Sequence, residues 1–206
     1  VFEKQGTADG ESRSAVFNPG TMTEKELAAE LKGNFTKGFA GRYGRLIAEH
    51  DLFGDALSLG LDSDPSVAFH ASYALERAFF IAPEAFERHI GHFVRNYLAI
   101  VNPSACRHYS KMMAWLLDRK RIELTDSQRR QIAETTFDRL IDPSVRPAVK
   151  VWSMEILDIL SAELPWVEEQ LYDTICWLMR DDGPALRNRG AKICRRIRAR
   201  RQTARR

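Results

Sequence analysis

The stretch Asp142-Pro143-Ser144-Val145-Arg146 decides the fold predicted for this chain, because the same motif recurs at near-constant spacing. It occurs again as Asp64-Pro65-Ser66-Val67 and Asn102-Pro103-Ser104-Ala105, and in altered form as Asp182-Gly183-Pro184-Ala185-Leu186. The four prolines are 38, 40 and 41 residues apart. A period of this size is typical of stacked helical repeats, in which each unit buries its apolar side against its neighbours.

Each of the four motifs predicts the start of a helix. A side chain such as that of Asp64 or Asn102 can accept the backbone N–H groups that the first turn of a helix leaves without partners. Proline suits the next position because its fixed φ fits a helix and its missing N–H would have no partner there. The helices predicted in this way are Pro65–Ile81, Pro103–Arg119, Pro143–Ala162 and Pro184–Arg200.

Apolar residues follow each proline at the same four distances, two, six, nine and thirteen positions later. On a helix with 100° per residue, these positions form one stripe roughly 60° wide, which we expect to be buried. The stripe consists of Val67, Ala71, Ala74 and Ala78, then Ala105, Tyr109, Met112 and Leu116, then Val145, Val149, Trp152 and Ile156, then Leu186, Gly190, Ile193 and Ile197.

The segments between these helices are also helical in pattern, and none has the alternating, β-branched pattern of a strand. They predict the first helix of each pair, over residues 52–61, 84–101, 126–141 and 166–180. Two more helices are predicted at Thr23–Lys32 and Phe39–His50, the first opened by a capping box between Thr23 and Glu26. The sequence therefore predicts an all-α fold.

We expect one helical-repeat domain over residues 22–200, capped by the two N-terminal helices. Residues 1–21 have little apolar periodicity, which predicts a disordered or loosely docked arm, and residues 201–206 form a basic tail. The repeats are predicted at about 51–81, 84–119, 126–162 and 166–200.

The motif Asp142-Pro143-Ser144-Val145-Arg146, followed by Val149 and Ile156-Leu157, resembles the second-helix signature of HEAT repeats, an armadillo-type family. The resemblance covers about residues 51–200, and it is weaker in the second repeat, where Ala105-Cys106 replaces the Val-Arg step, and in the last. It implies a right-handed α-α superhelix of about four helix pairs, whose second helices line a concave face. It implies no single activity.

Composition indicates a soluble globular protein, with 44% hydrophobic and 29% charged residues in 206. No apolar run approaches the roughly 20 residues of a membrane span, and no signal-peptide pattern opens the chain, so we expect no membrane association. The three cysteines, Cys106, Cys176 and Cys194, lack CxxC spacing and predict reduced thiols in a cytoplasmic protein.

The net charge of +3 conceals a strong asymmetry between the C-terminal end and the rest. Residues 187–206 contain ten Lys or Arg and no acid, which leaves 21 basic and 28 acidic residues elsewhere. Such an end predicts either contacts with phosphates or a polar cap on the last repeat, where cations also favour the end of a helix. The tail residues considered for binding are Arg196, Arg198, Arg200 and Arg201.

The positions four, eight, eleven and fifteen residues after each proline lie opposite the buried stripe and predict the open face of the repeats. This face is aromatic at one end and basic at the other, which suits a partner with an apolar and an anionic portion. Alternatively, neighbouring loops cover Phe69, Tyr73 and Phe80, since clustered aromatic residues rarely face solvent. The candidate binding residues are Phe69, Tyr73, Glu76, Arg107, Lys111, Met154, Asp158, Lys192 and Arg195.

No catalytic motif is present, because the chain has no glycine-rich phosphate loop and no G-x-S-x-G sequence. Helical-repeat alkylpurine DNA glycosylases resemble the predicted architecture, and the resemblance implies tryptophans and an aspartate at the base-holding site. Trp115, Trp152, Asp118 and Asp158 are the matching candidates here. However, the motif count places Trp152 in the buried stripe and Trp115 at its flank, so we interpret both as core residues.

The spacing of the histidines does not fit a metal site, and we predict neither a metal nor another cofactor. His89 and His92 are three residues apart, and His70 and His108 occupy equivalent positions in successive helices. A catalytic zinc site needs a third ligand, and neither HExxH nor Cys–His spacing supplies one.

These patterns favour a non-catalytic scaffold that binds a protein or peptide on its concave face. The alternative is a nucleic-acid-binding protein, related to the helical-repeat glycosylases, that uses Arg107, Lys111, Lys192, Arg195 and the basic tail. A scaffold predicts an exposed apolar patch at Phe69, Tyr73 and Met154, whereas a nucleic-acid binder predicts a continuous basic track.

Overall fold

The computed structural model of the chain describes residues 22–33, 35–180 and 183–203. Within these ranges all regular secondary structure is helical, which confirms the predicted all-α class. None of the helices described is both long and apolar enough to cross a membrane. The predicted N-terminal arm lies outside the described residues.

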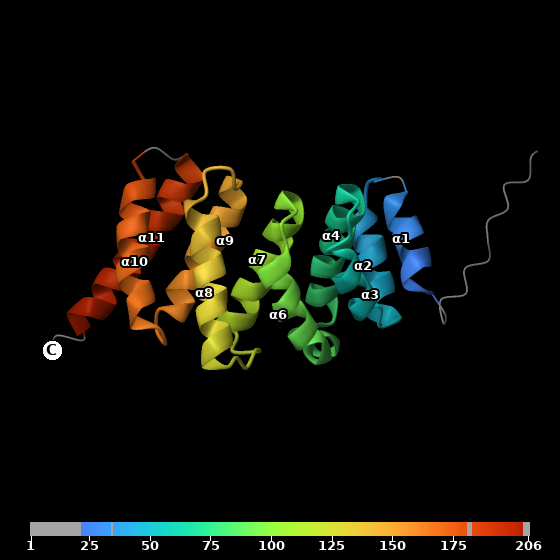
Figure 1. Cartoon of the computed structure of the whole chain (residues 1–206), viewed down its shortest axis with the longest axis horizontal. Helices are drawn as coiled ribbons and strands as arrows, with labels where there is room; N and C mark the ends of the chain where they lie inside the picture. Colours follow the sequence, from blue (N-terminus) through green and yellow to red (C-terminus); the bar gives the residue numbers. More distant parts are fainter. Residues whose placement is uncertain (1–21, 34, 181–182, 204–206) are drawn as a thin grey trace, which may run out of the picture.

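The helices lie side by side in chain order, from α1 at one end of an elongated molecule to α11 at the other (Figure 1). Their bounds are α1 Glu24–Lys32, α2 Phe39–Glu49, α3 Phe53–Leu59, α4 Pro65–Ile81, α5 Pro83–Phe86, the 3₁₀ turn η2 Glu87–His89, α6 Ile90–Ala99, α7 Pro103–Asp118, α8 Asp126–Ile141, α9 Pro147–Leu160, α10 Pro165–Leu178 and α11 Pro184–Thr203.

Side-chain caps fix several of these helix starts. The Asp64 carboxylate accepts the backbone N–H of Ser66 at 2.9 Å, and Asn102 accepts that of Ser104 at 3.0 Å. Thr23 forms the predicted capping box with Glu26. Each cap satisfies donors that the first helical turn leaves free, so the polar residues before these helices determine where the helices begin.

The motif in the third repeat does not start a helix, and the helix predicted from Pro143 begins at Pro147 instead. Asp142 does accept the N–H of Ser144 at 2.7 Å, but the chain then turns. The reason is Pro147, because a residue before proline is forced away from the helical region. Arg146 accordingly has φ −61° and ψ 143°, an extended conformation.

This later start changes which residues of α9 are buried. Counted from Pro147, the four stripe positions are Val149, Ser153, Ile156 and Leu160, and all four are buried. Two positions that the count from Pro143 placed in the core, Val145 and Trp152, are only half-buried. The predicted stripe of α4, α7 and α11 is buried throughout.

The helices that begin with the motif prolines pack on one another in succession. Helix α4 contacts α7, α7 contacts α9, and α9 contacts α11. The other helices cover them, with α2 and α3 against α4, α8 against α9, and α10 against α9 and α11. The core therefore extends along the whole row of helices, and one open side is formed by α4, α7, α9 and α11.

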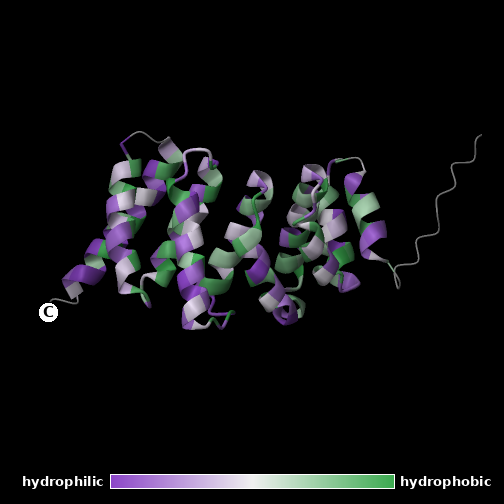
Figure 2. Cartoon of the chain, viewed as in Figure 1, coloured by the Kyte–Doolittle hydropathy of each residue, from purple (hydrophilic) through white to green (hydrophobic). Residues whose placement is uncertain are grey.

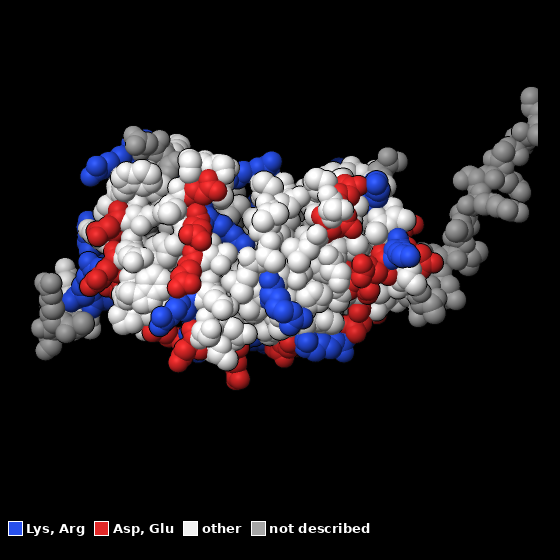
Figure 3. All heavy atoms as spheres, viewed as in Figure 1, with Lys and Arg blue, Asp and Glu red and all other residues white. Residues whose placement is uncertain are grey.

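The covering helices present a polar side to solvent, as the hydrophilic residues along α8 show (Figure 2). In the same view, acidic side chains form a row over α8 (Figure 3). Glu134 and Asp138 are exposed acids of this helix, whereas Ile132, Phe137 and Leu140 are buried. This amphipathic pattern holds α8 against the core by its apolar side.

Candidate functional site

A groove of about 530 Å³ runs over the open side of α4, α7, α9 and α11. We call it the inner groove. It is lined by Glu76, Arg77, Phe80, Lys111, Ala114, Trp115, Asp118, Trp152, Glu155, Ile159 and Arg189. A second hollow of about 500 Å³ shares Glu155 and Arg189 with it and adds Lys192, Arg195, Arg196 and Ala199. We call the second hollow the basic end.

Aromatic side chains form one wall of the inner groove. Trp115 contacts Phe79 and Phe80 edge-on, with ring centroids 5.0 and 6.1 Å apart. Trp115 and Trp152 are both half-buried, and neither indole N–H has an acceptor among the described residues. Such side chains offer an apolar face together with a free hydrogen-bond donor, a combination that is common at binding surfaces.

The carboxylate of Glu76 is held in place by two side chains of α7, His108 and Lys111. It accepts hydrogen bonds from His108 Nδ1 at 2.6 Å and from Lys111 Nζ at 2.5 Å. Desolvation raises the pKa of Glu76, but the hydrogen bonds from His108 and Lys111 outweigh it and bring the pKa below its usual value. At neutral pH this carboxylate is ionised, and its charge is already paired within the protein.

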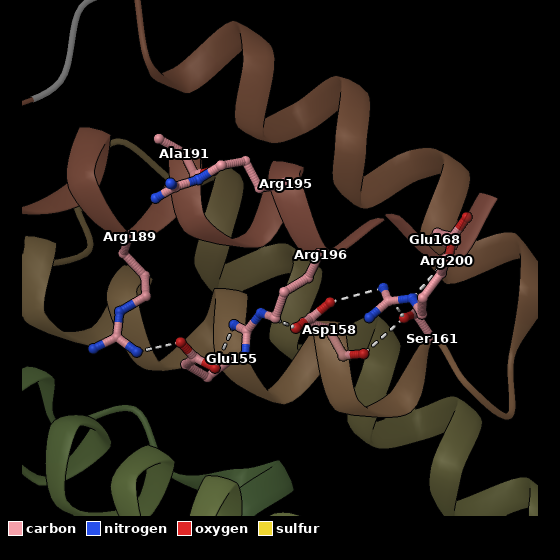
Figure 4. Close-up of polar contacts among 9 residues, drawn as sticks. All are labelled: Glu155, Asp158, Ser161, Glu168, Arg189, Ala191, Arg195, Arg196 and Arg200. Atoms are coloured by element: carbon pink, nitrogen blue, oxygen red, sulfur yellow. Dashed lines mark hydrogen bonds and ion pairs between the residues drawn. The ribbon is translucent and has the colours of Figure 1, made fainter. Parts of the chain in front are cut away.

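The basic end is built around two carboxylates of α9. Glu155 pairs with Arg189 and, at 2.9 Å, with Arg196. Asp158 pairs with Arg196 at 3.0 Å and with Arg200 at 2.8 Å (Figure 4). Three arginines of α11 are therefore used to fix this helix to α9.

The next turn of α11 is bound to α10 in a similar way. Glu168 pairs with Arg200 at 3.2 Å and with Arg201 at 2.8 Å. Desolvation raises the pKa of Glu168, but the hydrogen bonds from Arg201 and Arg200 outweigh it and lower the pKa. Arg198 donates to the Tyr172 hydroxyl at 2.7 Å. All four tail residues proposed for binding thus contact side chains of their own chain.

Two cations that line the basic end remain directed at solvent. Arg195 points away from the carboxylates of α9 in Figure 4, and its Nε makes only a 3.4 Å contact with the Ala191 carbonyl of the same helix. Lys192, one turn earlier, is exposed and forms no ion pair among the described residues. These two side chains give the basic end its available positive charge.

The other predicted binding residues fall in different environments. Glu76 and Lys111 line the inner groove, whereas Arg107 is exposed outside it. Asp158 is 5% exposed and paired with arginines. The predicted exposure of Met154 is wrong, because its side chain is fully buried. The count from Pro143 caused this error, since α9 begins four residues later.

Phe69 and Tyr73, two of the three aromatic residues at the other end, pack against a neighbouring loop, as the alternative interpretation expected, whereas the third, Phe80, lines the inner groove. Phe35, between α1 and α2, lies 5.7 Å from Phe69 and 6.1 Å from Tyr73 by ring centroids, and it stacks on His70 at 4.7 Å. Tyr73 stacks on His108 at 5.0 Å. The cluster is packed internally, and only Phe35, with 51% exposure, presents a large apolar surface.

Sequence reasoning missed the two tryptophans as parts of an open surface. The motif count assigns Trp152 to the core and Trp115 to its flank, yet both line the inner groove with Asp118. The sequence signal that could have placed Trp152 on the open surface is Pro147. This proline keeps Arg146 out of the helical conformation, so the helix begins at Pro147 and the buried positions are counted from there. Glu155 and Arg189 were also missed, since no local pattern shows that they pair.

No group of three or more metal-binding side chains comes together in the part of the chain that the structure describes. His70 Nδ1 lies 2.7 Å from the Leu31 carbonyl oxygen, and His89 lies 3.5 Å from Asp51. These histidines therefore have partners within the fold.

Comparisons with known proteins give no relative: no protein-family model matches the chain, and no curated protein or solved structure matches it either.

Proposed function

We propose that the chain is a non-catalytic scaffold that binds a segment of another protein in the inner groove. We further propose that its helices form a HEAT-like, right-handed superhelix, in which α4, α7, α9 and α11 line the concave side. The successive contacts of these four helices and the recurring Asp-Pro or Asn-Pro caps support this architecture.

The observation that carries this function is the change in chemistry along one continuous surface. Trp115, Trp152 and Phe80 supply large apolar side chains in the inner groove, and Lys192 and Arg195 supply free positive charge at the basic end. Tryptophan and arginine are the residues that most often dominate binding energy at protein interfaces. We therefore expect a partner segment with a large apolar side chain next to acidic residues.

The pairing of the groove's carboxylates favours binding over catalysis. Glu76 and Glu155 already accept hydrogen bonds from Lys111 and Arg196 of their own chain. A general base needs a carboxylate or imidazole that is free to take a proton from substrate. Asp118 is the remaining acid, and its nearest cation is Arg119, at 3.6 Å.

Nucleic-acid binding is the second candidate, favoured by one specific observation. Trp115, Trp152 and Asp118 line the same groove, and the resemblance to alkylpurine glycosylases implies tryptophans and an aspartate around a damaged base. Aromatic side chains can stack on an unpaired base. The charge of the inner groove does not support this candidate, because its three acids balance its three bases.

The test is a selection of peptides from a random display library, followed by binding measurements on the selected sequences. We expect enrichment of an aromatic or long aliphatic residue beside Asp or Glu. Replacement of Trp115 or Trp152 by Ala should weaken binding by about tenfold or more, as for other central aromatic contacts. Trp177→Ala is the matched control, because Trp177 is 57% exposed and lies outside the groove.

The same protein is titrated with mixed-sequence DNA and RNA at several salt concentrations. Tight binding with a steep salt dependence, together with failure to select peptides, contradicts the scaffold and favours the second candidate. Truncation of the chain after Arg187 would remove the basic residues of α11, but it is not a suitable test of the basic end. It would also remove Ile193 and Ile197, which belong to the core. Lys192→Ala and Arg195→Ala test the basic end without disturbing it.

The proposed location is the cytoplasm, as the cysteine content predicts. Cys106, Cys176 and Cys194 are free thiols in the structure. Measuring the location of the full-length chain in cells is the direct test of this prediction.

A further inference from the structure

A second cavity, of about 340 Å³, lies among α6, α7, α8 and the turn before α9. We call it the Arg139 cavity. It shares no residue with the inner groove, so an inference from it stands apart from the function proposed above. Its charged and titratable lining residues are Cys106, Asp138, Arg139, Asp142 and Arg146.

Arg139 is a buried cation that the described chain does not neutralise. Its side chain lies over the Tyr97 ring, with 4.5 Å from Cζ to the centroid, and the residue is only 9% exposed. Nη2 donates to the carbonyls of Tyr97 and Ile100 at 2.5 and 3.3 Å. Nη1 is buried without a partner, and no carboxylate among the described residues pairs with the guanidinium.

A buried charge without a counter-charge is unfavourable, and natural proteins almost always pair it. The backbone carbonyls and the Tyr97 ring offset part of the cost. They do not balance the charge itself. An anion in the cavity that Arg139 lines would do so.

The other titratable groups of the cavity do not provide that anion. Burial raises the pKa of the Cys106 thiol against the opposing effect of Arg139, so the thiol is neutral at pH 7. Asp138 and Asp142 line the same cavity but form no ion pair with Arg139. Arg146 adds positive charge and donates to the Ser104 hydroxyl at 3.2 Å.

Much of the remaining wall is apolar. It includes Leu98, Ile100, Val145 and Val149, and Val101, the last of which is 88% exposed. A fully hydrated inorganic ion gains nothing from such a wall, whereas a ligand with hydrocarbon groups gains from their transfer out of water.

We propose that the Arg139 cavity binds a small organic monocarboxylate, with its carboxylate toward Arg139 and its hydrocarbon part along Leu98, Val145 and Val149. Guanidinium and carboxylate groups form the strong, charge-assisted hydrogen bonds that are preferred in buried sites. A single negative charge fits better than a phosphate dianion, because Asp138 and Asp142 are close enough to line the same space.

The test uses calorimetric titration of the full chain with acetate, butyrate and hexanoate. Affinity should rise about fourfold for each added methylene until the cavity is filled. Hexan-1-ol and inorganic phosphate are the matched probes, and each should bind at least about tenfold more weakly than hexanoate. Equal affinity of acetate and hexanoate, equal affinity of hexanol and hexanoate, or no saturable binding of hexanoate at about 10 mM overturns the proposal.

Two variants locate the site. Arg139→Met should lose binding of hexanoate more than that of hexanol, and thermal unfolding shows whether it remains folded. Val101→Asp adds a negative charge at an exposed position of the cavity and should weaken hexanoate binding about fivefold or more without loss of folding. Leu61→Asp is the control, because Leu61 is also an exposed apolar residue but lies outside the cavity. Equal effects of Val101→Asp and Leu61→Asp on hexanoate binding contradict the assignment.

Discussion

Arg200 of α11 donates a hydrogen bond of 2.8 Å to Asp158 of α9, across 42 residues of sequence. The Asp158 side chain is only 4% exposed, so its charge depends on Arg200 and Arg196 for neutralisation. Arginines that make the C-terminal helix basic therefore also hold that helix in place. Ile193 and Ile197, on the same helix, complete the attachment through the core.

Arg200→Ala should destabilise the protein by about 1–2 kcal/mol, because Asp158 and Glu168 each lose one of their two arginines. Arg195→Ala, on the solvent side of the same helix, should change stability by less than about 0.5 kcal/mol. Urea denaturation followed by circular dichroism measures both. Similar losses for the two variants would mean that the pairing of Arg200 does not stabilise the fold.

Glu155→Gln should have opposite effects on stability and on binding. Loss of the pairs with Arg189 and Arg196 should cost about 1 kcal/mol, since both arginines are partly exposed. The same change removes the acid that lines the basic end, so an acidic peptide should bind more tightly. Glu169→Gln is the control, an exposed acid without an ion pair among the described residues. Unchanged or weaker binding of the acidic peptide to the Glu155→Gln variant would count against the basic end as part of the binding surface.

Glu76 makes stability depend on pH in a defined direction. Its pKa in the folded protein lies below the ordinary value of 4.5, so its pairing with His108 and Lys111 contributes fully above that value. The contribution is lost as the pH falls through the lower, folded pKa, because the unfolded chain binds the proton more readily. Stability should therefore decline below about pH 4.5 more steeply in the wild type than in Glu76→Gln.

At pH 7, Glu76→Gln should cost about 1–3 kcal/mol, since His108 and Lys111 lose a charged partner that is largely buried. Denaturant titrations at a series of pH values give both results. Parallel pH curves for the two proteins would show that Glu76 does not titrate differently on folding.

The prolines and caps of the sequence predicted most helix starts, because the physics of a helix start is local. Asp64 and Asn102 need only the N–H groups two and three residues later, and the structure contains these bonds. The helix start predicted at Pro143 in the third repeat was wrong for an equally local reason. The motif at Asp142 has its first hydrogen bond, but Pro147 prevents Arg146 from adopting the helical conformation that would continue it.

The candidate site was less predictable, because its properties depend on pairs distant in sequence. Rotation of α9 by the later start places Trp152 in the groove and Met154 in the core. From the sequence alone, the arginines of α11 had no evident ion-pair partner, because residues 187–206 contain no acid. Their partners Glu155, Asp158 and Glu168 become neighbours only when α11 packs on α9 and α10.

Trp152→Ala tests whether this residue belongs to the groove or to the core. A fully buried tryptophan replaced by alanine costs about 3–5 kcal/mol, but Trp152 is half-buried and should cost about 2 kcal/mol or less. Ile156→Ala, one turn later and fully buried, should cost more than Trp152→Ala although it removes fewer atoms. Denaturant midpoints rank the two variants. A larger loss of stability for Trp152→Ala than for Ile156→Ala would show that this tryptophan belongs to the core and would count against its role in binding.

Pro147→Ala should lengthen α9 by about one turn, back toward Pro143. In the wild type, Asp142 already accepts the Ser144 N–H at 2.7 Å, the same first bond that Asp64 makes with Ser66 at 2.9 Å where α4 begins. With alanine in place of Pro147, the preceding residue is free to become helical, and the amide that the substitution introduces can donate to the carbonyl of Pro143. Hydrogen exchange followed by NMR should then show protection of this introduced amide, and the far-UV helical signal should rise. Pro65→Ala, at the first position of α4, should produce neither change because Asp64 already caps that helix. Rapid exchange of the introduced amide would show instead that tertiary contacts of the turn, such as the one between Arg146 and Ser104, hold the later start.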